Sequence, residues 1–114
     1  MNKEYVLRKN EEIQKLVAKK KSVGNKYYAI YYNFTKDKAG IAFSASKKVG
    51  NAVERNYQKR VVKEIVRPLL KELCNLELLI VIKKASINLS FDIKKQEIEG
   101  LLKKIIKEKE NDKN

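Results

Sequence analysis

The chain has 114 residues, enough for one domain with a single small core, which excludes an enzyme that needs separate catalytic and regulatory domains. It carries 27 Lys and Arg against 14 Asp and Glu, a formal charge of +13, so a polyanionic partner such as nucleic acid is expected. The absence of histidine removes the commonest general base and metal ligand and argues against a conventional hydrolase or a zinc enzyme.

The first predicted element is a helix that begins after Asn10 and ends before Gly24. The Asn10 side chain can accept a hydrogen bond from a first-turn amide, and acidic residues follow it directly. Ile13 and Val17 contribute to a short apolar stripe on this helix. A further short strand over residues 3–7 is possible.

Aromatic strand formers fill residues 26–34, which lack helical periodicity and are predicted to form a strand. Alternation places Tyr28 and Tyr32 on one face and Tyr31 on the other, so aromatic rings are expected on both faces. A single tyrosine is more often a core residue than a ligand contact. With several tyrosines in one strand, we expect at least one ring to be exposed.

After a polar turn, residues 39–46 are predicted to form a strand that pairs back onto residues 26–34 as a hairpin. One face of this strand carries only small residues, namely Gly40, Ala42 and Ser44. If this face lies beside Tyr31, the missing side-chain volume leaves a shallow groove or a seat for a helix, and a helix is the more common occupant.

Three more elements are predicted: a helix from Ala52 to Pro68 capped by Asn51, a strand over 76–82 covered on both faces, and a helix from about Phe91. The charged residues 107–114 offer nothing to bury and are expected to fray.

The predicted architecture is therefore α+β, a single domain over residues 1–106 with a mixed sheet of about four strands and helices packed on it as an α/β sandwich. The lone Cys74 can form no internal disulfide and is expected to be a small buried residue. No apolar run is long enough to cross a bilayer, and no hydrophobic signal segment follows Met1. We expect a cytoplasmic protein that does not bind membranes.

The helix over 52–68 carries the candidate functional surface. On a helical wheel its apolar residues occupy one arc and its basic and amide residues another. Two lysines precede Gly50 at its N-terminus, where backbone amides favour phosphate. Such a basic arc alone is as often a solvated surface as a binding site, but the tyrosine-rich strand beside it favours RNA, whose bases stack on flat rings. The residues expected to bind RNA are Lys47, Lys48, Asn51, Arg55, Asn56, Lys59, Arg60 and Lys63.

The run Ser44–Asn56, followed by Lys59 and Arg60, resembles the signature helix of the bacterial ribonuclease P protein component. The similarity extends over residues 5–105, and its specific part is 44–60. Three flanking stretches are similar as well: 7–12, 22–31 and 80–85.

The resemblance implies a non-catalytic subunit of an endoribonuclease that removes the 5′ leader of precursor tRNA. The partner RNA would hold Mg²⁺ and perform the hydrolysis, with one protein monomer and one RNA in the ribonucleoprotein. The basic helix would face the catalytic RNA, and a cleft between the first helix and the sheet would take the leader. It also implies a ribosomal-protein-like fold, with a left-handed connection between two parallel strands. The expected leader contacts are Ile13, Val17, Tyr28, Tyr31 and Tyr32.

Two departures from the family pattern stand out. Tyr57 occupies the position where the family usually has a second arginine, so one phosphate contact is replaced by stacking or by nothing. Ile13 and Val17 stand where the family's first helix usually offers aromatic rings, which predicts weaker leader contact.

Two alternatives stay open. A different RNA-binding module, such as a ribosomal protein, would share the charge, the size and the β-α-β core, and only the signature helix separates the two readings. A metal-dependent nuclease would need clustered carboxylates. The acidic candidates are far apart in sequence and are better explained as charge balance: Asp37, Glu54, Glu64 and Asp92.

Overall fold

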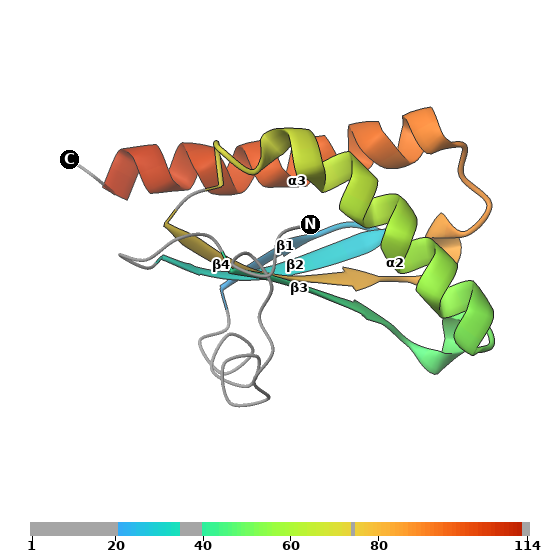
Figure 1. Ribbon diagram of the computed structural model, residues 1–114. Helices are drawn as coiled ribbons and strands as arrows, with labels where there is room; N and C mark the ends of the chain where they lie inside the picture. Colours follow the sequence, from blue (N-terminus) through green and yellow to red (C-terminus); the bar gives the residue numbers. More distant parts are fainter. Residues whose placement is uncertain (1–20, 35–39, 74, 113–114) are drawn as a thin grey trace.

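The computed structural model describes residues 21–34, 40–73 and 75–112, which form one four-stranded sheet and two long helices (Figure 1). The prediction of an α+β fold with a mixed sheet is confirmed. The strands are β1 (Ser22–Gly24), β2 (Tyr28–Phe34), β3 (Gly40–Ala45) and β4 (Leu76–Ile82). The long helices are α2 (Ala52–Val66) and α3 (Phe91–Asp112), and the short 3-10 turns are η2 (Lys47–Val49), η3 (Arg67–Leu69) and η4 (Lys84–Ser86).

The strand order is β1-β2-β4-β3, so β4 lies between β2 and β3. It pairs antiparallel with β2 and parallel with β3, and Ile80 stands opposite both Ile30 and Phe43. The prediction that residues 39–46 pair with residues 26–34 is therefore wrong. Because β4 lies between two strands and beneath the helices, its faces and edges are covered, which suits the nearly all-apolar segment Leu76–Ile82.

Both helices lie on the same face of the sheet (Figure 1). Alternate residues of β2 and β4 point into this layer, among them the fully buried Ile30 and Ile80. Val62 and Ile65 from α2 and Ile98 from α3 pack onto them. Each such aliphatic side chain stabilises the fold by about 1.5–3 kcal/mol through removal from water, so this layer fixes α2 in place.

The opposite face of the sheet carries a short row of side chains across three strands. Tyr31 of β2 pairs with Leu79 of β4, and Leu79 pairs with Ala42 of β3. Leu79 and Ala42 are buried, and the half-buried Tyr31 packs against them. Neither α2 nor α3 lies on this face, so Tyr31 is separated from the helical layer by the sheet.

Two predicted boundaries are wrong. The first helix was expected to end just before Gly24, but Ser22–Gly24 form β1, which pairs antiparallel with β2 through Val23 and Ile30. The remainder of that helix, with Ile13 and Val17, lies outside the described residues, as do residues 3–7 and Cys74.

The expected fraying of residues 107–114 is also wrong over 107–112, because α3 continues to Asp112. Contacts far apart in sequence hold this end. Glu108 accepts a hydrogen bond from the Tyr32 hydroxyl and lies 3.8 Å from the Lys21 ammonium. Lys109 Nζ lies 3.4 Å from the Glu72 carbonyl oxygen. Although α3 is long, neither it nor any other helix in the described part of the chain is apolar enough to cross a membrane.

Replacing Tyr28 with phenylalanine is expected to change the free energy of unfolding by less than about 1 kcal/mol at pH 7. The Tyr28 hydroxyl is buried and makes no hydrogen bond of good geometry with any described residue, so phenylalanine removes no such bond there. Burial raises the pKa of Tyr28 above its ordinary value of 10.0; the nearby Ser86 side chain opposes this shift and Glu97 adds to it.

Because this raised pKa belongs to the folded state, the stability that neutral Tyr28 contributes is present below pH 10.0 and is lost as the pH rises through the folded value. Urea unfolding between pH 7 and pH 11 should therefore show a smaller alkaline loss for Tyr28→Phe than for the parent protein. The exposed Tyr57→Phe serves as a control. An alkaline loss equal to the parent's would contradict the expectation.

Candidate nucleic-acid interface

A tight turn brings the chain from β3 into α2. Gly50 has a φ of 150°, and a Cβ atom there would lie 3.0 Å from Cγ of Glu54, so glycine suits both the backbone and the space. The Asn51 side chain accepts a hydrogen bond from the Glu54 amide at 2.9 Å and caps the helix, as predicted. This turn places the exposed Lys47 and Lys48 beside the N-terminus of α2.

The eight residues expected to bind RNA all lie on η2, the turn and the first twelve residues of α2. Five of them are exposed and three are half-buried, so each offers at least part of its side chain to a partner. We call this set the basic surface: Lys47, Lys48, Asn51, Arg55, Asn56, Lys59, Arg60 and Lys63.

The two flanks of α2 face different neighbours. Lys63 Nζ lies 5.7 Å from the ring centre of Phe43 on β3, so the flank with Lys63 and Lys59 is directed toward the β3 edge of the sheet. Gln58 receives a hydrogen bond from Lys94 of α3 at 3.0 Å, which marks the opposite side. The basic surface therefore extends from the outer side of α2 toward the β3 edge.

Arg55 is the cation of the basic surface whose surroundings are most unusual. It is half-buried, and its Nε is buried without a hydrogen-bond partner among the described residues. A buried guanidinium N–H without an acceptor is rare in folded proteins, because the loss of its hydration is uncompensated. Part of the Arg55 side chain stays exposed on α2, whereas its Nε is closed to solvent and can meet an external acceptor only if the side chain moves.

A chain of polar side chains links α3 to the first turn of α2. Lys94 Nζ donates to Gln58 Oε1 at 3.0 Å, and Gln58 Nε2 donates to Glu54 Oε1 at 3.0 Å. Lys94 is only 5% exposed; burial lowers its pKa, and the charge of Glu54 opposes this shift. This polar chain ties the N-terminal half of α2, which carries much of the basic surface, to α3.

Sequence reasoning missed this polar chain, although a signal was present. Gln58 falls in the middle of the apolar arc of α2, and Lys94 lies four residues before the buried Ile98 and so on the same face of α3. Two polar residues on buried helix faces predict a buried pair, because each needs a partner there.

The structure overturns two of the predicted leader contacts. Tyr28 is fully buried and Tyr32 is 4% exposed, and both lie beneath the helices. Neither ring can stack on a nucleobase, because the helical layer covers that face of the sheet. Tyr31 lies on the other face and keeps an exposed part.

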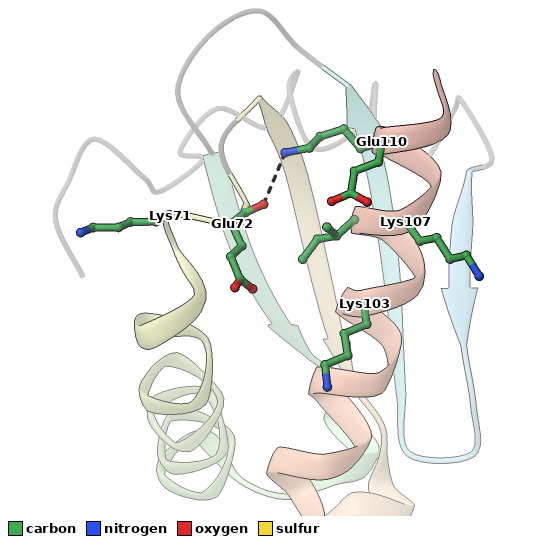
Figure 2. A pocket seen from close by; sticks show the side chains of 7 residues that line it. Lys71, Glu72, Lys103, Lys107 and Glu110 are labelled. Carbon is green, nitrogen blue, oxygen red and sulfur yellow. Dashed lines mark hydrogen bonds between the residues drawn. The ribbon is translucent and has the colours of Figure 1, made fainter. Parts of the chain in front are cut away.

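A hollow of about 470 Å³ opens between the chain after α2 and the C-terminal half of α3 (Figure 2). At this hollow Lys109 Nζ donates to the Glu72 carbonyl oxygen at 3.4 Å. Its wall combines apolar and charged residues: Lys71, Glu72, Lys103, Ile106, Lys107, Lys109 and Glu110. No three carboxylate, Cys or His side chains within the described ranges are grouped to hold a metal ion, here or on the basic surface.

The sequence was compared with protein families and with curated proteins. A family model described as Ribonuclease P matches residues 1–106. The Ribonuclease P protein component of Mycoplasma mobile is 34% identical over 110 residues, which cover 96% of this chain and 97% of that protein. The one from Staphylococcus haemolyticus is 32% identical over 108 residues, covering 94% and 91%.

Solved structures resemble the fold closely. The RNase P protein of Staphylococcus aureus superposes with a TM-score of 0.80 at 27% identity, over 87% of this chain and 93% of that one. The RNase P protein from Thermotoga maritima gives a TM-score of 0.78 at 22% identity, over 86% and 94%, a likeness that concerns the fold alone. Sequence and fold relatives thus carry one and the same name.

Proposed function

The chain belongs to the ribonuclease P protein family and is the protein subunit of that ribonucleoprotein, and from this premise we propose that its basic surface binds a catalytic RNA subunit. The observation that carries the proposal is the gathering of eight cationic and amide side chains on one capped helix and its entry turn, five of them exposed. RNA phosphates and base edges supply the acceptors that these donors require.

In this proposal the RNA performs the hydrolysis and holds Mg²⁺. The two carboxylates of α2 are engaged within the protein: Glu54 accepts from Gln58, and Glu64 lies 3.2 Å from the Arg67 guanidinium. This pairing supports their role in charge balance. The protein's own contribution is then electrostatic, since cations on a rigid helix lower the repulsion between RNA phosphates and precursor tRNA.

The 5′ leader of precursor tRNA is proposed to contact the sheet face that carries Tyr31, together with Ile13 and Val17. Tyr31 is half-buried and packs against Leu79 and Ala42, so part of its side chain stays accessible to a flat base. We further propose a cytoplasmic complex of one protein and one RNA.

Cleavage of a 5′-extended precursor tRNA at low Mg²⁺ tests the proposal. The organism's ribonuclease P RNA is assayed with and without this protein, beside the protein alone. Cleavage should increase only when both are combined, because the protein's cations replace part of the Mg²⁺ that shields phosphates. Cleavage by the protein alone would move the chemistry to its carboxylates. No stimulation with RNA binding intact would favour a ribosomal-protein-like module.

Lys59→Ala is expected to lower the slope of log affinity against log salt by about 0.7–0.9 in binding to the same RNA. That change corresponds to the loss of one phosphate contact. Lys103→Ala is the matched control, since it removes an equal charge from an exposed position on the hollow. Equal changes for both variants would mean that RNA responds to net charge and not to the basic surface.

A further inference from the structure

Large apolar side chains are exposed at one end of the helical layer. Tyr57 on α2 is 56% exposed, and Phe91 at the start of α3 is 51% exposed. The other large exposed apolar residues of the described chain are the aliphatic Val53 and Ile93. Both aromatic rings remain in water although burial of a ring is strongly favourable. A partner that covers them would therefore gain binding free energy from their burial.

The hydrogen bond between Gln58 and Lys94 marks the sides of α2 and α3 that face each other, and the positions of Tyr57 and Phe91 follow from it. Lys63 marks the flank of α2 that faces β3, and at 100° per residue Tyr57 falls on the other flank, toward α3. On α3, Phe91 precedes Lys94 by one turn and shares its side of the helix with Lys109, which contacts the chain after α2. By this count Tyr57 lies on the flank of α2 toward α3, and Phe91 lies on the side of α3 toward the chain after α2.

We propose that Tyr57 and Phe91 together hold one unpaired nucleobase of the RNA that the basic surface binds. The inference rests on the proposed function and adds a specific contact to it. Asn56 and Arg60 adjoin Tyr57 on the exposed side of α2, and Lys95 is exposed on α3 near Phe91. Flat rings bordered by cations are the composition of a single-strand RNA site, in which the rings stack on a base and the cations neutralise its phosphates.

A protein partner fits these surroundings less well. Ile93 lies on the side of α3 away from α2, so the aliphatic residues extend the aromatic pair only by Val53, which is one turn from Tyr57 on the same face of α2. The centre of a protein interface is depleted of charged residues, whereas these rings stand beside the basic surface of a chain with a charge of +13. The charge complementarity favours RNA.

The test measures binding of the ribonuclease P RNA, transcribed from the same genome, over a series of salt concentrations. Tyr57→Ala and Phe91→Ala should each weaken binding about ten-fold, as expected for the loss of one stacked ring. The slope against salt should not change, because no charge is removed. Tyr57→Phe should retain parent affinity, and Val53→Ala, a truncation of an exposed apolar residue one turn away, should do the same. If both rings hold one base, the double variant should lose less than the product of the single losses.

Three results would each overturn the shared stacking site. Tyr57→Ala could bind RNA with parent affinity, or Tyr57→Phe and Tyr57→Ala could lose equal affinity, or the loss in the double variant could equal the product of the single losses. So would a dimer in sedimentation that Tyr57→Ala dissociates, because the rings would then bind a second copy. Lys59→Ala separates the two proposals. If Lys59→Ala changes the salt slope and Tyr57→Ala keeps parent affinity, RNA binding by α2 stands and the stacking site is rejected. If neither variant changes RNA binding, both proposals are rejected.

Discussion

Gln58→Leu is expected to lower the free energy of unfolding by about 3 kcal/mol, because it removes the acceptor of a buried ammonium. Leucine is close to glutamine in size, so little of this loss comes from packing. Lys94, 5% exposed, donates to Gln58 at 3.0 Å, and the substitution leaves its charge in a largely apolar place. Urea unfolding at pH 7 measures the change.

The double variant Gln58→Leu with Lys94→Met is the decisive control. Replacing both partners by apolar groups of similar shape should restore stability to within about 1 kcal/mol of the parent. Burial lowers the pKa of Lys94 below its ordinary value of 10.5, so the unfolded chain binds the proton more tightly. The penalty in Gln58→Leu should therefore shrink as the pH rises toward 10.5. Equal stability of the single and double variants would contradict this account.

Arg55→Ala is expected to weaken RNA binding by about 2 kcal/mol, since it removes a charged, half-buried hydrogen-bond donor from the basic surface. Arg55→Lys retains the charge but lacks the planar fork and the Nε position. It should keep the parent's salt dependence while its affinity stays low. Titration of labelled RNA at several salt concentrations separates the two effects.

Arg67→Ala provides the comparison, because Arg67 is exposed and already paired with Glu64 at 3.2 Å. Its loss should change affinity little. Thermal unfolding of each variant checks that the fold is intact. Full recovery of affinity by Arg55→Lys would show that charge alone matters at this position.

Local patterns made much of the helical site predictable. Asn51 is followed by a clear amphipathic repeat, and both the cap and the helix are found where the sequence places them. The basic arc follows from the same 3.6-residue period. The aromatic strand and the apolar strand Leu76–Ile82 were also located correctly, because alternation and β-branched content are local properties.

What the sequence left open depends on contacts between distant segments. Alternation separates Tyr28 from Tyr31, but nothing local tells which face the helices cover, and the structure buries Tyr28. The hairpin expectation followed from the tendency of neighbouring strands to pair, and the more apolar β4 displaced that pairing. Likewise, α3 extends past residue 106 because Glu108 and Lys109 meet partners far away in sequence.

The central place of β4 has a consequence for the order of assembly during translation. β4 is the last of the described strands to be synthesised, and β3 has its ladder partner only there. The antiparallel pair β1–β2 can form early, whereas β3 must wait with its edge unpaired, a nonlocal step that is slow compared with hairpin closure. Because α2 lies between β3 and β4 in the chain, its cations reach their final arrangement only when β4 joins the sheet. A nascent chain therefore presents its complete basic surface late, after β4 has joined the sheet.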